Sequence, residues 1–373
     1  MRLATRRQWE VFAGALRFAA LLGASFGGAV GAAVLKPPLL GAALGACSGL
    51  LDATALMALI GGAEIFVPRT RLGRRLAQLP FLAVLVIKFA VYTAVIVAVI
   101  GGQLGLRTVM LAVDEPTAAA YREQVQASLP RGLLGAVAAI TTFLLLLLRQ
   151  AAQIVGERTG RDIALGRYHR PRTEERFFLF IDIVGSTPVA ERLGAPAVHR
   201  YLNRIFQEAS DPIDDHGGEV YQYVGDEIVV TWRVPDGRAA ARPLACLFAV
   251  EAALARAAPE FEREFGTVPR LRAALHAGEV VAGESGGSRR AIVFHGDVMN
   301  TTSRVENLTR ELGQPFLVSE DALVRLEGTD AYALKDMGPQ PLRGRQASLH
   351  VYAVALRARG GEDLASPILG AGL

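Results

Sequence analysis

Four long apolar runs in the first 150 residues constrain this fold more than any other feature of the sequence. They span about Val11–Leu35, Pro38–Phe66, Leu79–Gly102 and Gly132–Leu148. Each is close to the roughly 20 residues that a helix needs to cross the hydrocarbon core of a bilayer. The chain has 373 residues and is 51% hydrophobic, and the apolar excess lies in this part. The sequence therefore predicts an N-terminal α-helical transmembrane domain of four helices over residues 1–148.

Basic residues flank these runs unevenly. They occur at the N-terminus, between the second and third runs, and directly after the fourth, as Arg2, Arg6, Arg7, Arg69, Arg71, Arg74, Arg75 and Arg149. Lys and Arg concentrate on the cytoplasmic side of membranes, so we expect the N-terminus and the C-terminal half in the cytoplasm. The first run is too long for a signal-peptide core, so we interpret it as an anchor. These flanks hold much of the basic excess, and we expect no nucleic-acid partner.

Small residues recur at every fourth position in the first two runs, as Gly23, Gly27 and Gly31 and as Gly41, Gly45 and Gly49. Such a face lets two helix backbones approach closely in lipid. Glycine is also common in membrane helices without any packing role, so both interpretations stay open.

Two charges stand out inside the apolar runs, Asp52 in the second and Lys88 in the third. A charge within a membrane segment is expected to have a partner and a function. We therefore hypothesise that Asp52 and Lys88 pair and help to set a signalling state. Alternatively, Lys88 lies close enough to the cytoplasmic end to extend its amine to the interface.

The second half has the composition of a soluble domain and alternates strand and helix patterns. We expect a helical and coupling linker over 149–175, which transmits motion or acts as a spacer, a domain over 176–356, and a tail over 357–373. The two cysteines, Cys47 and Cys246, offer no disulfide framework or zinc cluster. The expected strands are Phe177–Ile183, Glu219–Val224, Ile228–Trp232, Leu271–Glu279, Ile292–Phe294, Phe316–Ser319, Ala331–Lys335 and Leu349–Ala355, and the expected helices are Pro188–Gly217, Ala239–Phe265 and Val298–Leu312.

The opening order β-α-β-β-α-β predicts an α+β ferredoxin-like, palm-type core. In this arrangement the end of the first strand and the turn of the following hairpin lie side by side, so Asp182 and Asp226 should converge. Paired carboxylates are hard ligands suited to Mg²⁺ or Mn²⁺ beside substrate phosphates. Taken singly, each aspartate is also an ordinary turn residue, so the two positions together carry the metal prediction.

From about Arg176 to Val354 the chain resembles the catalytic domain of the class III nucleotidyl cyclases. The resemblance rests on F-I-D-I-V-G-S-T, G-G-E-V-Y-Q-Y-V-G-D-E, L-H-A-G-E-V-V-A-G-E, H-G-D-V-M-N-T-T-S-R and L-R-G-R. Upstream, G-R-Y-H-R-P-R resembles the coupling segment of membrane-bound bacterial members. The resemblance implies attack of the ribose 3′-hydroxyl on the α-phosphate of a nucleoside triphosphate, which releases pyrophosphate. It also implies two divalent cations per site and a head-to-tail homodimer with active sites at its interface.

The resemblance also assigns roles to residues. Asp182 and Asp226 match the metal-binding aspartates, and Ile183 matches the position whose carbonyl also binds metal. Asn300 and Arg304 match the catalytic pair that the partner chain supplies. Phosphate-binding positions are Gly185, Ser186, Thr187 and Arg343, where the family has a lysine in place of Arg343.

Purine selection departs from the family pattern. The base-contacting positions correspond to Gln222 and Val293, whereas adenylyl cyclases of the family usually place Lys and Asp or Thr there, and guanylyl cyclases Glu and Cys. The Gln222 amide can donate and accept, so it fits either purine. An insertion within 285–292 could shift the position assigned to Val293. We expect ATP as the substrate, with GTP as the alternative.

The expected protein is thus an adenylate cyclase, a multi-pass protein of the bacterial inner membrane with a cytoplasmic catalytic domain. A catalytically silent nucleotide-sensing receptor is a second hypothesis, and retention of Asp182, Asp226, Asn300 and Arg304 argues against it. A diguanylate cyclase is disfavoured, because Gly217-Gly218-Glu219 precedes the hairpin strand and does not form its turn. A transporter is the weakest hypothesis, since the apolar runs contain few polar residues that could line a substrate path.

Overall fold

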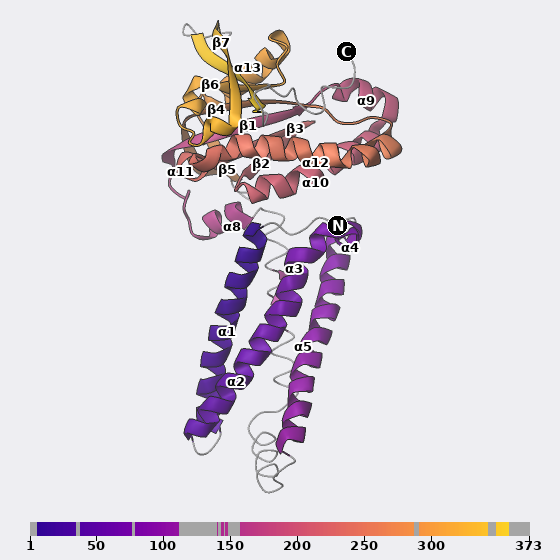
Figure 1. Ribbon diagram of the computed structural model, residues 1–373, viewed down its shortest axis with the longest axis vertical. Coiled ribbons are helices and arrows are strands. Elements are labelled where there is room, and N and C mark those ends of the chain that lie inside the picture. The colour runs from indigo at the N-terminus through magenta and orange to yellow at the C-terminus, as the bar shows by residue number, and fades with distance from the viewer. Residues whose placement is uncertain are drawn as a thin grey trace. The chain divides into compact units, whose positions relative to one another are not determined.

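The computed structural model describes residues 6–34, 38–76, 79–111, 140, 143–144, 146–147, 157–286, 291–341 and 348–357. The chain divides into two compact units, Met1–Glu157 and Arg158–Leu373 (Figure 1). Each unit is considered by itself below.

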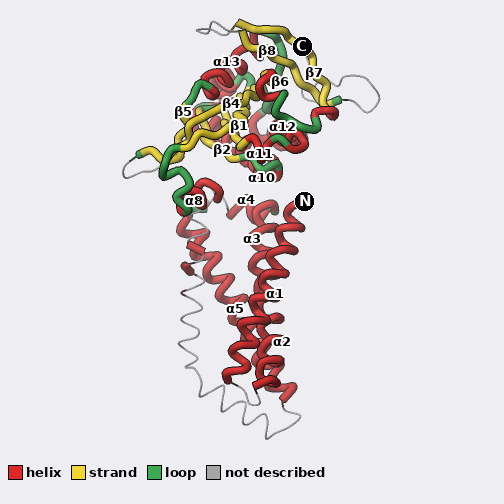
Figure 2. Tube along the Cα trace, turned by 90° about the vertical axis from the view of Figure 1, so that its left-hand side faces the viewer, coloured by secondary structure: helices red, strands yellow, loops and turns green. Residues whose placement is uncertain are grey.

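The described part of the first unit is helical (Figure 2). Helix α1 spans Arg6–Val34, α2 spans Pro38–Leu56, and a π-helical turn at Met57–Gly61 leads into α3, Gly62–Phe66. A 3-10 turn at Val67–Arg69 and helix α4, Arg71–Leu76, precede α5, Phe81–Leu111.

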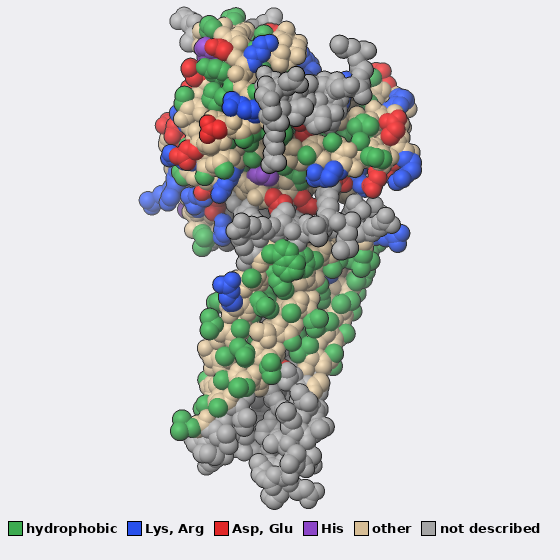
Figure 3. Space-filling model, in the orientation of Figure 1, with side chains coloured by type: hydrophobic (Ala, Val, Ile, Leu, Met, Phe, Trp, Pro, Cys, Tyr) green, Lys and Arg blue, Asp and Glu red, His purple; other side chains and the backbone are tan. Residues whose placement is uncertain are grey.

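Three stretches of these helices are long and apolar enough to cross a membrane, namely Phe12–Ala29, Ala46–Phe66 and Phe81–Val99. Figure 3 shows charged side chains gathered on the second unit and few on α1 and α2. The predicted fourth run, Gly132–Leu148, lies mostly outside the described residues. Among the described residues, three spanning candidates are therefore observed where the sequence predicts four.

Helices α1 and α2 pack through the predicted small residues. A Cβ atom on Gly23 would lie 2.2 Å from the Gly49 carbonyl oxygen, and one on Gly49 would lie 2.0 Å from the Gly23 carbonyl oxygen. No side chain fits at this separation, so the two glycines permit the contact. The structure favours the packing interpretation of the glycine spacing.

The predicted pairing of Asp52 with Lys88 is wrong. Lys88 Nζ lies 2.8 Å from Glu64 Oε1, and Tyr92 donates its hydroxyl to the same carboxylate at 2.5 Å. Asp52 instead lies 3.5 Å from the Ser48 hydroxyl. Helix length explains the error, because Asp52 lies twelve residues before Glu64, about 18 Å along a helix. Glu64 and Lys88 both lie close to the short connection between α3 and α5, so they meet at one level.

The second unit begins with α8, Glu157–Ala164, and builds an eight-stranded sheet in the order β2-β3-β1-β4-β6-β8-β7, with β5 paired to β4. The strands are β1 Arg172–Ile183, β2 Glu219–Val224, β3 Glu227–Arg233, β4 Leu271–Ser285, β5 Ala291–His295, β6 Phe316–Ser319, β7 Tyr332–Pro341 and β8 Ser348–Leu356. The helices are α9 Ser186–Leu193, α10 Ala195–Asp215, α11 Val234–Gly237, α12 Arg242–Phe265, α13 Val298–Glu311 and α14 Glu320–Leu323, and 3-10 turns cover Ala239–Ala241 and Thr329–Ala331.

Strand β1 lies at the centre and is buried on both faces. Phe177, Leu179 and Ile181 pack into the large core that also holds side chains of α10 and α12. Phe178 and Phe180 point to the opposite face, where they meet Val298 at the start of α13. Because side chains alternate along a strand, Asp182 and Arg176 lie on the face of Phe178 and Phe180. That face carries the site described below.

Most predicted elements are observed, with two differences that have simple causes. The helix predicted over 188–217 is split into α9 and α10 at Gly194, whose φ of 75° an α-helix cannot accommodate. The strand predicted over Leu271–Glu279 continues to Ser285 as β4, because Gly283–Ser285 pair with β5.

Candidate functional site

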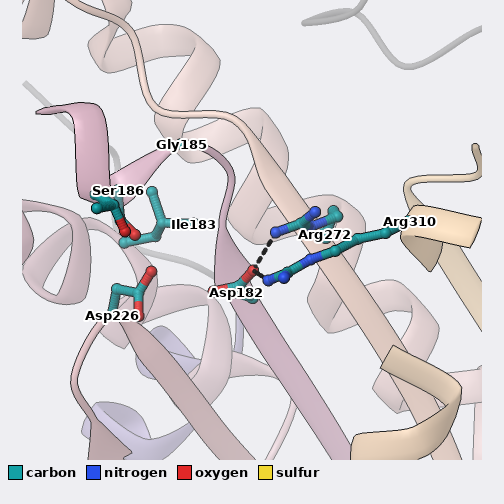
Figure 4. Close-up of a pocket in the computed structure, with 8 residues that line it drawn as sticks. Asp182, Ile183, Gly185, Ser186, Asp226, Arg272 and Arg310 are labelled. Atoms are coloured by element: carbon teal, nitrogen blue, oxygen red, sulfur yellow. Dashed lines mark hydrogen bonds and ion pairs between the residues drawn. The ribbon is translucent and has the colours of Figure 1, made fainter. Parts of the chain in front are cut away.

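A pocket of about 290 Å³ opens where β1 ends. Its lining comes from the end of β1, the start of α9, the β2–β3 turn, β4 and α13, and consists of Asp182, Ile183, Gly185, Ser186, Thr187, Asp226, Arg272 and Arg310. Figure 4 shows Asp182 between Asp226 on one side and the two arginines on the other. The two aspartates that the sequence predicts to converge thus line one pocket.

The hairpin of β2 and β3 brings Asp226 to this pocket. Gly225 and Asp226 form its turn, and Gly225 has a φ of 63°. Only glycine adopts that backbone conformation freely, so Gly225 makes the tight turn possible. Strand β3 then pairs with β1 from Ile181↔Ile228 onwards, which places the turn beside the end of β1.

Asp182 is held by two arginines. Arg272 lies directly opposite Asp182 in the antiparallel pairing of β1 with β4, and its Nη2 donates to Asp182 Oδ2 at 2.7 Å. Arg310 reaches the same oxygen from α13 at 3.5 Å. The Asp182 side chain is only 9% exposed, whereas that of Arg310 is 58% exposed. Arg310 is therefore the partner that a bound anion could attract away more easily.

Two further acids lie behind the aspartates. Burial raises the pKa of Glu227 to about 7, and repulsion from Glu306, Asp182 and Asp226 adds to the rise. Burial, followed by repulsion from Asp182, also raises the pKa of Glu306. Four acids thus share one region with two arginines, and such a concentration of negative charge attracts cations.

The donor set fits a hard divalent cation. Asp182 and Asp226 offer carboxylate oxygens and the end of β1 offers backbone oxygen. No group of three His, Cys, Asp or Glu side chains that could hold a metal occurs among the residues that the structure describes. Water or substrate phosphate would have to complete the shell, as is usual for Mg²⁺.

Phosphate groups also have donors in this pocket. Ser186 and Thr187 begin helix α9, directly after Gly185, and all three residues line the pocket. The free N–H groups of a helix N-terminus favour an anion.

The other predicted site residues lie elsewhere. Asn300 is exposed and Arg304 half-buried on α13, and neither lines the pocket. Arg304 Nη1 is buried without a hydrogen-bond partner in the described part of the chain. Gln222 is exposed on β2, Val293 is half-buried on β5, and Arg343 lies outside the described residues.

Arg272 and Arg310 were missed by the sequence predictions. Arg272 lies in a predicted strand, and only the pairing register of β1 with β4 shows that it faces Asp182. An arginine opposite an aspartate across paired strands is a recognisable signal once the register is known. Arg310 has no local signal, since it lies ten residues after Asn300 and on another side of α13.

Comparisons with known proteins agree with the resemblance noted in the sequence. Residues 169–355 match the family described as "Adenylate and Guanylate cyclase catalytic domain". Adenylate cyclase 2 of Rhizobium meliloti is 39% identical over 217 residues, which cover 57% of this chain and 60% of that protein. Adenylate cyclase of Anabaena cylindrica is 28% identical over 188 residues, covering 49% of this chain and 37% of that protein.

The solved structure of a bacterial light-regulated adenylyl cyclase has a TM-score of 0.48 and 21% identity, with 57% of this chain and 63% of that chain covered. The chain spans less than two thirds of the length of the two adenylate cyclases of Rhizobium meliloti and Anabaena cylindrica.

Proposed function

We propose that this chain, which belongs to the adenylate and guanylate cyclase catalytic-domain family over residues 169–355, converts ATP to 3′,5′-cyclic AMP and pyrophosphate. One observation carries the proposal: Asp182 and Asp226 line a single pocket together with two arginines and a helix N-terminus. The pocket therefore combines ligands for divalent cations with donors for phosphate.

Asp182, Asp226 and the carbonyl of Ile183 would hold the metal ions, two Mg²⁺ or Mn²⁺ per site. When bound, these ions supply charge neutralisation at the phosphates and activate the attacking hydroxyl. The start of α9 at Gly185, Ser186 and Thr187 binds phosphate oxygens.

Arg272 and Arg310 face the same pocket and neutralise the triphosphate. Arg343 is the further phosphate ligand that the family resemblance suggests. Arginine can hold two oxygens of one phosphate at once, which orients as well as attracts the group.

We further propose that two chains form a head-to-tail homodimer and share each site. Asn300 and Arg304 lie on α13 and do not line the pocket of their own chain, which supports a role in the site of the partner. There Asn300 orients the ribose and Arg304 stabilises charge at the reacting phosphate.

The base contacts are proposed at Gln222 and Val293. Val293 offers no polar side-chain atom, so the Gln222 amide would make the polar contact with the purine. The names of the two curated relatives, both adenylate cyclases, support ATP over GTP.

The apolar helices support membrane anchoring. We propose a transmembrane domain over 1–148, a linker over 149–175, a catalytic domain over 176–356 and a tail over 357–373. The basic flanks support a cytoplasmic N-terminus and catalytic domain, and we propose the inner membrane of a bacterium as the location.

A product assay on the purified full-length protein tests the proposal. With Mn²⁺, we expect cyclic AMP from ATP at a much higher rate than cyclic GMP from GTP. Asp226→Ala should abolish both activities, because one metal-binding carboxylate is lost.

A reversed product ratio would assign guanylate cyclase activity. Nucleotide binding without either product would indicate a silent receptor. Full activity of Asp226→Ala would overturn the metal assignment.

A further inference from the structure

Arg176 lies six residues before Asp182 on the same face of β1, and it is the centre of a buried polar network. Its side chain is 1% exposed, although an isolated charge in a protein interior is strongly unfavourable. Its Nε donates to Glu174 at 2.5 Å, and its Nη1 donates to Glu219 at 3.3 Å. These two carboxylates compensate the burial and raise the pKa of Arg176 above its usual value.

The network ties β1 to two strands that carry proposed base contacts. Glu219 is the first residue of β2, the strand that holds Gln222. The guanidinium carbon of Arg176 lies 4.5 Å from the ring centroid of Phe294, which belongs to β5 and directly follows Val293. Through one side chain, β1 thus contacts both β2 and β5.

The rings beside Arg176 bring the same two strands together directly. Phe294 packs against Tyr221 with ring centroids 5.0 Å apart, and against Phe178 at 5.6 Å. Tyr221 precedes Gln222 and Phe294 follows Val293, so this contact joins the two strand segments that carry the proposed base positions. A shift of the Arg176 guanidinium would therefore displace the Phe294 ring that it contacts.

The segment before β1 supplies the remaining partner. Tyr168 is fully buried, accepts a hydrogen bond from Arg176 Nη2 at 3.0 Å and donates to Glu174 at 3.1 Å. Its carbonyl accepts the N–H of Glu284 on β4 at 2.9 Å. The position of Tyr168 is therefore linked to that of Arg176 by direct contacts.

We propose that Arg176 is a positioning residue for nucleotide binding, which sets the spacing of β2 and β5 and is itself held by Tyr168 from the segment preceding β1. This inference rests on the proposed function, because it concerns the affinity of the same site for its nucleotide. It predicts that loosening Arg176 weakens nucleotide binding and leaves the metal-binding end of β1 competent.

Tyr168→Phe in the full-length protein tests this inference, because the change removes only the hydroxyl. We expect the KM for ATP to rise about three- to tenfold, the effect of losing one typical intramolecular hydrogen bond, while kcat changes less than about twofold. Binding of 3′-deoxy-ATP, which lacks the attacking hydroxyl, should weaken by the same factor. Glu219→Gln should raise KM in the same way, and its combination with Tyr168→Phe should be less than additive because both act through Arg176.

Glu175→Gln is the matched control, since Glu175 lies beside Arg176 on β1 but pairs with Arg325 at 2.7 Å. It should leave KM and 3′-deoxy-ATP affinity unchanged. A purely structural role of the network would lower Tm and the active fraction of Tyr168→Phe and leave both constants as in the wild type. That result, or an equal shift in Glu175→Gln, would overturn the inference. A wild type that makes no cyclic nucleotide would instead reject the proposed function, and the 3′-deoxy-ATP titration would still report on Arg176.

Discussion

Charge compensation governs the candidate site at the scale of single residues. Two arginine side chains contact one oxygen of Asp182. Their positively charged guanidinium groups therefore already lie where the proposed metal and phosphates would bind. Arg272 comes from the neighbouring strand and Arg310 from an exposed helix position. Binding of a metal–nucleotide complex would replace these ion pairs with carboxylate–metal and arginine–phosphate contacts. Because charged contacts replace charged contacts, the net free-energy cost of breaking the ion pairs stays low.

Sequence reasoning reached Asp182 and Asp226 because each follows a strand pattern and both match one family. It missed Arg272 because a strand pattern does not contain its pairing register. It missed Glu64 because that residue lies within an apolar run, although counting every charge in the run would have found it. Contacts that depend on a tertiary register are therefore the ones that a single sequence leaves open.

Glu251 offers a test of burial that is independent of catalysis. It is 3% exposed on α12, and burial raises its pKa from 4.5 to about 7. The folded pKa lies above the unfolded one, so the neutral acid stabilises the fold at low pH and this contribution is lost as the pH rises through 7. We expect Glu251→Gln to be more stable than wild type by about 2 kcal/mol at pH 8, and to differ much less at pH 5.

Thermal unfolding of the full chain between pH 5 and pH 8 measures the effect of Glu251→Gln. Glu262→Gln, at an exposed position of the same helix, should follow the wild-type pH dependence. A Glu251→Gln variant that also follows it would show that Glu251 ionises normally in the folded protein.

At the scale of elements, two residues of the helical unit make contact only if they lie at the same height along their neighbouring helices. The glycine faces of α1 and α2 were predictable because a four-residue spacing keeps residues on one side of a helix. The choice between Asp52 and Glu64 as the partner of Lys88 was not, because the pairing depends on where the connection places α3 against α5. The π-helical turn at Met57–Gly61 adds a change of register that no propensity argument indicates.

Lys88→Met should destabilise this unit, because it leaves the 4% exposed Glu64 carboxylate without its cation. We expect a loss of about 1–3 kcal/mol, seen as a lower melting temperature of the detergent-solubilised protein. The double variant Glu64→Gln with Lys88→Met should recover most of it. Asp52→Asn should leave the Lys88 contact intact, and a larger loss in Asp52→Asn than in Lys88→Met would contradict the observed pairing.

At the scale of the whole molecule, the proposed function requires two chains for each site. Asp182 and Asp226 lie on one surface of the sheet unit, while Asn300 and Arg304 lie on α13 outside that pocket. Each chain would thus hold the metal-binding half of one site and the Asn/Arg half of the other. The order of strands and helices was readable from the sequence, whereas this division of labour rests on the family resemblance and on the separation of the two sets of residues.

Co-expression of Asp226→Ala and Arg304→Ala chains with different tags, followed by purification of dimers that carry both tags, tests this claim most directly. In a head-to-tail dimer one site receives both defects and the other receives none, so we expect about half the wild-type rate of cyclic AMP formation. Dimers of Asp182→Ala with Asp226→Ala, which place a defect in the metal-binding half of each site, should remain inactive. An inactive Asp226→Ala/Arg304→Ala dimer that still assembles would contradict a site shared between two chains.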